Sequence, residues 1–384
     1  MSIRKLAVVT AVAAVILAAC TSASPGASTG ASTGASTAAS AAASLKPCLV
    51  GVSWNDYDQE RWKKADEPQM KKAIEAAGGT YTRTDAKKSS EQQLADIDNL
   101  IGQGVGAIIL LSKDTKTIKP ALDRAADAGI TVIAYDRLVE DPREFYMSFD
   151  NPTVGKVIAE SVMKVAPKGN YAIILGDATD ANAKFLRDGM TAAGIPAKGV
   201  TGGPITVVFE QNTPDWATEG ARNNMQAALN STTPVNNIQA VLAENDGMAG
   251  GAIAALKEVG LTVPVGGQDG DKAALNRVAL GTQTVSVWKN AFALGELGGS
   301  VAMQLCRGVA LKDVKAPSDL PAGAAPKDLD AHEFTTPEGN KMWSIILTPT
   351  PVFQDNVNEP LDAGWVAKAD LCAGVDPAKV PACK

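Results

Sequence analysis

The stretch ITVIAYDR at residues 130–137 ends on two opposite charges, Asp136 and Arg137. Its apolar and β-branched residues are typical of a buried strand, so the charges are expected where that strand stops. A carboxylate accepts hydrogen bonds and a guanidinium donates them, which suits a polar ligand that has both kinds of group. The alternative is an ion pair on the protein surface.

Polar side chains recur where other apolar stretches end or where the next helical segment begins. Singly, each also has a structural explanation: Asp246 as a helix cap, Trp216 as a core residue and Lys289 as a solvated side chain. Together they supply carboxylates that accept from adjacent hydroxyls, cations that donate, and an indole for an apolar face, which is the set that a sugar requires. The residues concerned are Asp136, Arg137, Asn182, Trp216, Asn245 with Asp246, Asp269 and Lys289.

Short apolar stretches alternate with longer helical ones from residue 48 onward, which is the pattern of βαβ units and a parallel sheet. Strands are expected at 48–54, 80–86, 105–112, 130–136, 145–150, 171–176, 205–210, 238–245 and 263–269. We therefore predict an α/β fold with two similar Rossmann-like domains. A helix at 290–308 precedes another apolar stretch at 342–352, so the chain is expected to cross between the domains more than once. Ligands of open α/β sheets bind at the carboxyl ends of the strands, where the polar residues are expected.

The N-terminus predicts export. Arg4 and Lys5 precede an uncharged stretch at 6–19 that is too short to span a bilayer, so 1–19 is interpreted as a signal peptide. The stretch ends in LAAC, which resembles the bacterial lipobox, and Cys20 is the expected lipidation site. Residues 20–46 are rich in Ser, Thr, Gly and Ala and predict a flexible tether. The expected location is the extracytoplasmic face of the cell membrane.

Charge and composition exclude several functions. The formal net charge is −6 and there is no basic run, so nucleic acid is not an expected partner. The chain has one histidine, His332, in a segment rich in Pro, Gly and Asp that predicts an exposed loop, and it has no CxxC motif. Neither a metal site nor a cofactor is expected. The glycines at 102, 104 and 106 lack the spacing of a phosphate-binding loop.

Four cysteines remain beside Cys20, which fits two disulfides in an oxidising compartment. Cys48 lies at the start of the first strand, at the end opposite the ligand cleft that is expected at the carboxyl ends of the strands. Cys306 ends a helix that starts at this cleft and runs outward, so the two cysteines are expected to meet. Cys372 and Cys383 are separated by a short loop with two prolines and a glycine and are expected to form the second pair.

The stretch from about Cys48 to Val352 resembles the xylose-binding proteins of bacterial ABC sugar transporters, which have the type I periplasmic-binding fold. Eight segments carry the resemblance in order. They are ERW at 60–62, AYDR at 134–137, FYMSFDN at 145–151, NAK at 182–184, ND with AGGAI between 245 and 253, GQD at 267–269, GTQT at 281–284 and LTP at 347–349.

The resemblance implies that the ligand is a monosaccharide, with D-xylose preferred. It also implies a monomeric binding protein without enzymatic activity, which delivers the sugar to a membrane permease. It implies that hinge crossovers join the domains, near 148–151, 281–285 and 347–350, and that they close around the sugar. The expected first domain is 47–149 with 285–347, and the second is 150–284 with 348–384. The family's pocket positions correspond here to Arg61, Asp136, Arg137, Asn182, Trp216, Asn245, Asp269 and Lys289. The loop SWNDYD and Ala181 depart from the family pattern, and 354–384 lies beyond the resemblance.

Three other functions share parts of these features. A transcription regulator of this fold would need a DNA-binding helix pair where this chain has a signal and a tether. A glycosidase would need a carboxylate pair such as Asp136 with Asp269, but each is expected to stay ionised beside a cation. A receptor subunit that reports sugar to a chemotaxis protein or a sensor kinase would use the same pocket and differ only in its partner.

Overall fold

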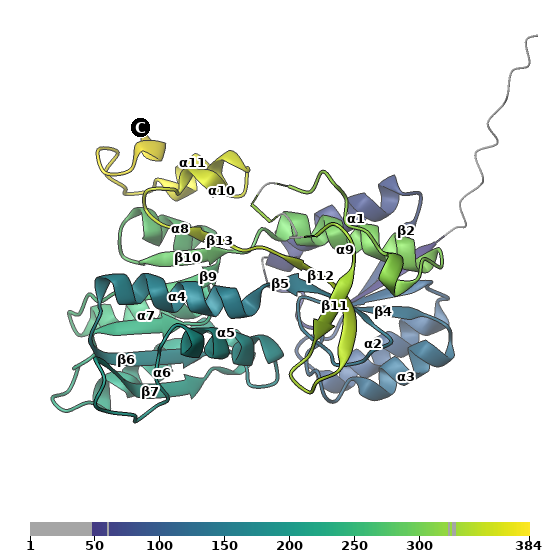
Figure 1. Ribbon diagram of the computed structural model, residues 1–384. Helices are drawn as coiled ribbons and strands as arrows, with labels where there is room; N and C mark the ends of the chain where they lie inside the picture. The colour runs from purple at the N-terminus through teal and green to yellow at the C-terminus, as the bar shows by residue number, and fades with distance from the viewer. Residues whose placement is uncertain (1–47, 60, 322, 325–327) are drawn as a thin grey trace, which may run out of the picture. The chain divides into compact units, whose positions relative to one another are not determined.

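A computed structural model describes residues 48–384, except residue 60, residue 322 and residues 325–327 (Figure 1). The expected signal peptide 1–19, the tether 20–46 and the lipidation site Cys20 lie outside the described residues. None of the helices in the described ranges is long and apolar enough to cross a membrane. The expected α/β class is confirmed, because helices alternate with the strands of two mostly parallel sheets.

The first sheet has seven strands in the order β11-β12-β5-β4-β3-β1-β2. All neighbours are parallel except β11, which pairs with β12 in antiparallel fashion. The strands are β1 Leu49–Trp54, β2 Thr80–Asp85, β3 Ala107–Leu110, β4 Thr131–Tyr135, β5 Phe145–Phe149, β11 His332–Thr335 and β12 Lys341–Leu347. Its helices are α1 Glu67–Ala76, α2 Ser90–Gly102, α3 Lys119–Asp127 and α9 Ala291–Cys306, and a π-helical turn, Trp62–Asp66, leads into α1.

The second sheet has six strands in the order β13-β10-β9-β8-β6-β7, and only β13 is antiparallel to its neighbour. The strands are β6 Gly169–Leu175, β7 Ile205–Asn212, β8 Ala240–Ala243, β9 Val265–Asp269, β10 Val285–Trp288 and β13 Thr350–Val352. Its helices are α4 Asn151–Val165, α5 Ala181–Ala192, α6 Thr218–Asn230, α7 Asp246–Glu258 and α8 Lys272–Ala279. Three-residue 3₁₀ turns lie at Pro214–Trp216, Leu311–Asp313 and Pro381–Cys383.

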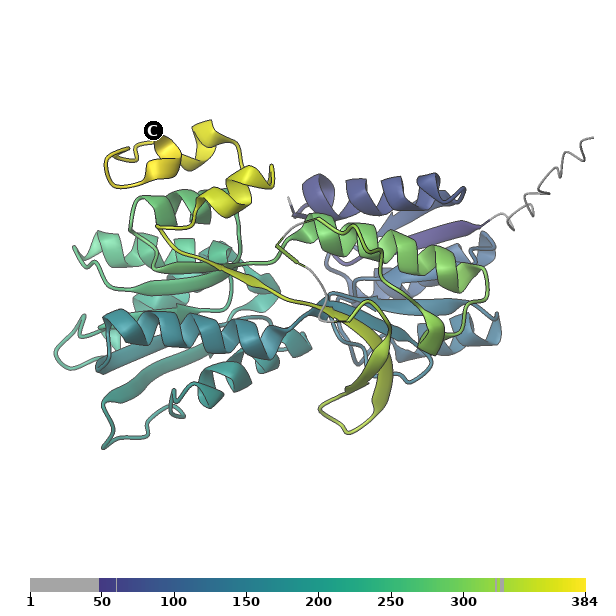
Figure 2. The ribbon, with the colours of Figure 1, turned by 45° about the horizontal axis from the view of Figure 1, so that its top comes forward.

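The chain passes between the sheets three times, at Asp150, between β10 and α9, and between β12 and β13 (Figure 2). The expected boundary at 285 is wrong for β10. This strand pairs with β9 in the second sheet, with Val285 opposite Gly266 and Trp288 opposite Asp269. The second crossover therefore lies at 289–290, four residues later than expected, and α9 is the first element after it that packs on the first sheet.

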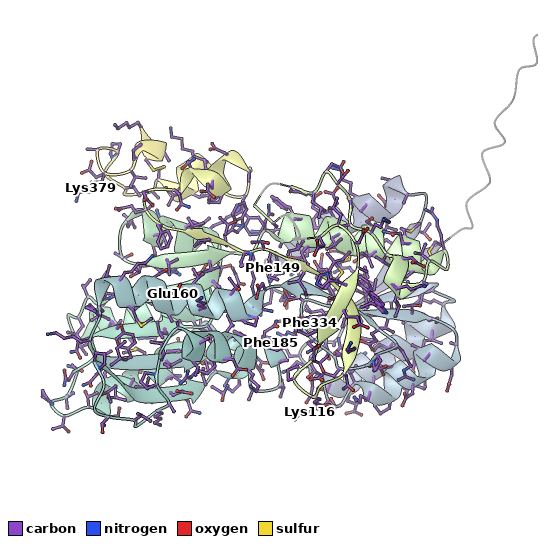
Figure 3. All side chains as sticks on the ribbon, viewed as in Figure 1. Lys116, Phe149, Glu160, Phe185, Phe334 and Lys379 are labelled. Carbon is purple, nitrogen blue, oxygen red and sulfur yellow. A yellow bond between two sulfur atoms is a disulfide. The ribbon has the colours of Figure 1, made fainter. Side chains whose placement is uncertain are left out.

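The hairpin of β11 and β12 holds the single histidine and contacts the second sheet. His332 does not lie in an exposed loop as expected, because it is the first residue of β11 and pairs with Ser344 of β12. The ring of Phe334 on the same strand contacts Phe185 of α5, with centroids 6.3 Å apart (Figure 3). The hairpin β11–β12 therefore touches a helix of the second sheet.

The residues from 353 to 384 fold against the second sheet. Their helices, α10 Asn358–Asp362 and α11 Lys368–Leu371, join a buried apolar cluster with α8 and β10. Both expected disulfides are present. The Cα atoms are 6.2 Å apart in Cys48–Cys306 and 5.5 Å apart in Cys372–Cys383.

Candidate functional site

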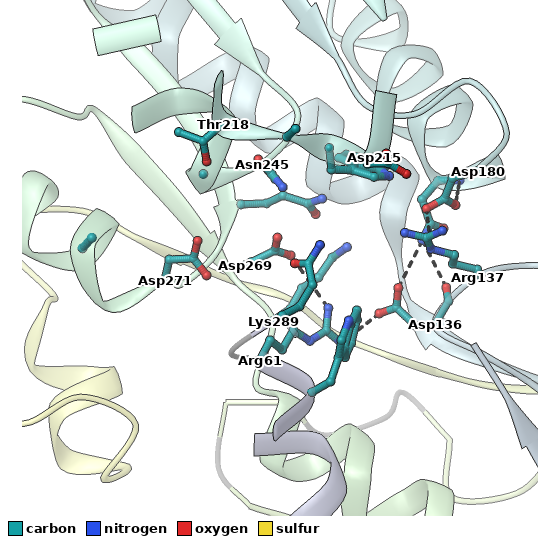
Figure 4. A pocket seen from close by; sticks show the side chains of 18 of the residues that line it. Arg61, Asp136, Arg137, Asp180, Asp215, Thr218, Asn245, Asp269, Asp271 and Lys289 are labelled. Carbon is teal, nitrogen blue, oxygen red and sulfur yellow. Dashed lines mark hydrogen bonds and ion pairs between the residues drawn. The ribbon is translucent and has the colours of Figure 1, made fainter. Parts of the chain in front are cut away.

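All eight residues that were expected at one site line the same cavity, which has a volume of about 400 Å³ (Figure 4). Asp136 follows β4 of the first sheet, whereas Asn245, Asp269 and Lys289 lie at the carboxyl ends of β8, β9 and β10 in the second. The carboxyl ends of parallel strands share one edge, so both sheets present their polar residues to the cavity. The remaining lining residues include Gln59, Trp62, Lys88, Asp180, Asp215, Thr218, Gln268, Asp271 and Lys272.

Arg61 and Asp136 form the centre of the first-sheet side. The Nη2 atom of Arg61 donates to Oδ2 of Asp136 at 2.8 Å, and its Nε donates to Oδ2 of Asp66 at 3.2 Å. Asp136 has a φ of 63°, in the left-handed region that Asp tolerates better than most residues. Its amide donates to the carbonyl of Met147, and its carbonyl accepts from Oγ of Ser148. These backbone contacts fix the carboxylate at the cavity.

Arg137 and Asn182 connect the two sheets. The Nε atom of Arg137 lies 2.9 Å from Oδ2 of Asp180, the residue that caps α5, and its Nη1 donates to the carbonyl of Ser112. Asn182 donates from Nδ2 to the carbonyl of Asp136 at 3.2 Å. Both side chains are buried and already have protein partners, so their orientation is set before any ligand binds.

Asp269 and Lys289 face the cavity from the second sheet. Asp269 has a φ of 100°, and its Oδ1 lies 4.0 Å from Nη1 of Arg61. Within the described residues, no side chain donates a hydrogen bond to this carboxylate at ordinary distance. Lys289 is only 2% exposed, with its ammonium 6.0 Å from the ring centroid of Phe149. Two complementary charges are thus available to a polar ligand.

The helix cap at α7 is Asn245 and not Asp246, for which capping was the alternative to a place at the site. The Oδ1 atom of Asn245 accepts from the amide of Met248 at 2.7 Å. Asp246 is fully buried and accepts from the amides of Gly270 and Asp271 as well as from Gln283 and Ser286. This carboxylate joins the loops after β8 and β9. It does not face the cavity.

Two indoles lie at the cavity, and only Trp216 was expected there. Trp216 rests on Gly176, where any side chain would overlap its ring. Trp62 is 6% exposed and stacks on Trp54 with centroids 5.8 Å apart, and the guanidinium of Arg61 lies 4.4 Å from its ring centroid. The sequence signal for Trp62 was its position beside Arg61 in the motif ERW.

The charges in the cavity stabilise one another. Burial alone would raise the pKa of Asp136, but Arg61, Lys289 and Arg137 lower it below the usual value. Burial raises the pKa of Asp269, which Lys289 and Arg61 partly oppose. Burial lowers the pKa of Lys289, which the two carboxylates oppose in turn.

Asp66 accepts hydrogen bonds from Arg61 and from the hydroxyl of Tyr135 and so holds Arg61 at the cavity. Burial raises the pKa of Asp66 to about 6, although Arg61 and Tyr135 act in the opposite direction. The set can hold hydroxyl groups through charged donors and acceptors. Because Asp136 is held ionised by three cations, it is poorly suited to protonate a leaving group.

Known proteins share both the sequence and the fold. A family model described as a periplasmic binding protein domain matches residues 50–310. The D-xylose-binding periplasmic protein of Escherichia coli K12 is 35% identical over 299 residues, which is 77% of this chain and 88% of that protein. A protein of the same description from Haemophilus influenzae is 33% identical over 82% of this chain and 89% of its own length.

A solved structure agrees with these relatives. It is an ABC transporter solute-binding protein from Clostridium phytofermentans with bound β-D-glucose, and it is 28% identical with a TM-score of 0.72. The match covers 84% of this chain and 99% of that chain. The chain therefore belongs to the periplasmic binding protein family, and it is a binding protein and not an enzyme.

Proposed function

We propose that this protein captures a monosaccharide, most tightly D-xylose, and delivers it as a monomer to the permease of an ABC transporter. One observation carries the proposal: charged, amide and indole side chains from two sheets line a single cavity of about 400 Å³. Cavities of roughly 300–1,000 Å³ are typical of small-molecule sites. The description of two relatives as D-xylose-binding proteins supports the choice of sugar.

In this proposal Asp136 and Asp269 accept from sugar hydroxyls, while Arg61, Arg137 and Lys289 donate to hydroxyl or ring oxygens. Asn182 and Asn245 contribute amide donors and acceptors. Trp216 and Trp62 cover apolar C–H surface of the ring, as indoles do for flat ligands with an apolar face. Trp62 is included among these ligand-binding residues because it lines the cavity.

Binding would proceed by hinge closure about the crossovers at 150, 289–290 and 348–349. The ligand contacts residues of both sheets at once only when the two are close together, so it shifts the population toward the closed form. The permease would then recognise that form.

Titration calorimetry of the mature chain against a panel of aldoses tests the function. We expect heat with D-xylose, weaker binding of glucose, arabinose and ribose, and no consumption of the sugar. Tighter binding of glucose than of xylose would reject the choice of sugar but keep the class. The absence of heat with every aldose would reject sugar binding itself.

Binding should weaken as the pH falls. Burial raises the pKa of Asp269, and a protonated carboxyl is a poorer acceptor for hydroxyls than a carboxylate. The loss should therefore begin above the usual aspartate pKa of about 3.9. Asp136, whose pKa is lowered, should stay ionised over the same range.

Affinity measured at a series of pH values checks this expectation in the wild type and in Asp269→Asn. The variant should bind weakly at all pH values and should lose less affinity in acid than the wild type, because only Asp66, whose pKa burial raises to about 6, still titrates beside Arg61. An acid loss of the same size in both proteins would assign the titration to another group.

We also propose that a lipid on Cys20 holds the protein at the extracytoplasmic face of the membrane. The lipobox-like sequence LAAC supports this proposal. Mass spectrometry of the protein from its host should show loss of residues 1–19 and an added diacylglyceryl group. Cys20→Ser should leave the precursor uncut, and an unmodified chain that begins at Thr21 or later would rule the anchor out.

A further inference from the structure

The residues from 353 to 384, named here the C-terminal segment, pack on the elements that carry two of the cavity's charges. The segment lies beyond the family match at 50–310. Its apolar side chains contact Trp288 of β10 and Leu275 and Val278 of α8. Asn276 of α8 donates to the carbonyls of Leu371 and Ala373, each at 2.9 Å. Lys289 directly follows Trp288, and Asp269 precedes α8 by three residues.

Trp365 makes the contact nearest to the cavity. Its Nε1 donates to the carbonyl of Gly270 at 2.6 Å. Gly270 follows Asp269, has a φ of 76°, and donates from its amide to Oδ2 of Asp246 at 3.0 Å. Both polar groups of this glycine are thus held. Asp269, which has a φ of 100°, directly precedes this glycine.

The ring of Trp365 also lies over the second crossover. Its centroid is 5.9 Å from that of Trp288 and 5.0 Å from that of Phe292. Trp288 belongs to the second sheet, whereas Phe292 lies in the first turn of α9, which packs on the first. Lys289 lies between these two aromatic residues in the chain. One indole therefore contacts the chain on both sides of a hinge crossover.

A small cavity of about 160 Å³ lies beside this ring. Its lining includes Arg61, Gly270, Phe292 and Trp365. Arg61 lines this cavity and the main one alike. Trp365 therefore stands behind the ligand cavity without lining it.

We propose that Trp365 is a positioning residue for ligand binding, held by the C-terminal segment and acting through Gly270 on Asp269. The inference rests on the proposed sugar site. The hydrogen bond from Trp365 to Gly270 keeps the loop after β9 in the conformation that points the Asp269 carboxylate toward the ligand. The ring of Trp365 supports Trp288 and Phe292 on either side of Lys289. The Cys372–Cys383 disulfide closes the end of the segment that packs on α8.

The test is Trp365→Phe in the mature chain, which keeps one aromatic ring for the contacts with Trp288 and Phe292 and removes the indole donor together with the smaller ring. Loss of one hydrogen bond should raise the dissociation constant for D-xylose roughly three- to tenfold. The change should lie in the dissociation rate, because the aim of Asp269 governs how well bound sugar is held. Trp365→Ala, which also removes the ring, should bind more weakly still.

Hydrogen exchange gives a second readout that needs no ligand. The amides of Gly270 and Asp271, which donate to Asp246, should exchange faster in Trp365→Phe than in the wild type. Trp343→Phe is the matched control, because Trp343 lies on β12 and pairs with Phe145 and Glu333 on the first sheet. It should change neither quantity.

The outcomes separate the two proposals. If the wild type binds no aldose, the proposed function fails, whereas the exchange of the two amides still reports on the positioning role. If the wild type binds and Trp365→Phe binds equally well with unchanged exchange, the positioning role is overturned. Faster exchange with unchanged affinity would also overturn it, because the loop would then be irrelevant to the ligand.

Discussion

Replacing Asp269 by alanine is expected to weaken D-xylose binding about 10- to 150-fold, because losing a charged hydrogen-bond partner costs about 1.5–3 kcal/mol. The carboxylate lines the cavity, and its contact with a cation of the protein is a 4.0 Å approach to Arg61. It is therefore an acceptor that a ligand can reach without breaking a hydrogen bond of the described residues. Among the described residues no hydrogen bond ends on this carboxylate, and Asp136 remains to offset the charge of the buried Lys289, so the unliganded fold should survive with some loss of stability.

Arg137→Ala should also weaken binding, but it is a less clean test. The guanidinium of Arg137 lies 2.9 Å from Asp180, which is 4% exposed, and it also donates to the carbonyl of Ser112. Its loss would leave a buried carboxylate without its cation, which lowers stability as well as affinity. The Asp269 variant separates the two effects.

Calorimetry with D-xylose and the melting temperature of the free protein measure these effects. Asp98→Ala is the matched control, because Asp98 is a half-exposed carboxylate on α2 that pairs with Arg124 on the surface. It should leave the affinity unchanged. Equal affinities for the wild type and Asp269→Ala would remove Asp269 from the site.

The gathering of polar residues could be predicted because the topology of parallel sheets enforces it. Asp136, Asn245, Asp269 and Lys289 each end an apolar strand, and in a parallel sheet these ends share one edge. The sequence did not need to specify any contact between them. The arrangement of two sheets followed from the alternation of strands and helices that starts again after 145–150.

Local pattern did not determine which sheet receives a strand. The stretch TVSVW predicts a strand in either domain, and only its pairing with β9 assigns it to the second. Likewise Asn245 and Asp246 are both good caps by type. The choice is set by the buried donors around Asp246, which come from residues 270, 271, 283 and 286, distant in the sequence.

The C-terminal segment was the least predictable part. Its helices have five and four residues, too short to show helical periodicity in the sequence. Their positions depend on packing against Trp288 and Leu275 and on one disulfide. The role of Trp365 follows from a tertiary hydrogen bond to Gly270, ninety-five residues away, and has no local signal.

Loss of the Cys48–Cys306 disulfide should have the largest effect on stability. This bond joins residues 258 apart, and the chain-entropy description gives a loop of that size roughly 5 kcal/mol. Cys372–Cys383 spans 11 residues, for which the same description gives about 3 kcal/mol. We therefore expect Cys48→Ser/Cys306→Ser to lower the free energy of unfolding by more than Cys372→Ser/Cys383→Ser.

Urea unfolding of both double variants measures this difference. Cys48 precedes β1 and Cys306 ends α9, whereas the cavity lies at the opposite, carboxyl end of the strands, so D-xylose affinity should be unchanged in the first variant. The second variant should lose less stability but some affinity, because its disulfide closes the segment that holds Trp365. If the first variant lost affinity under conditions in which it is fully folded, the separation of this disulfide from the site would be contradicted. A change in the entropy of the unfolded chain cannot alter the cavity of the folded protein.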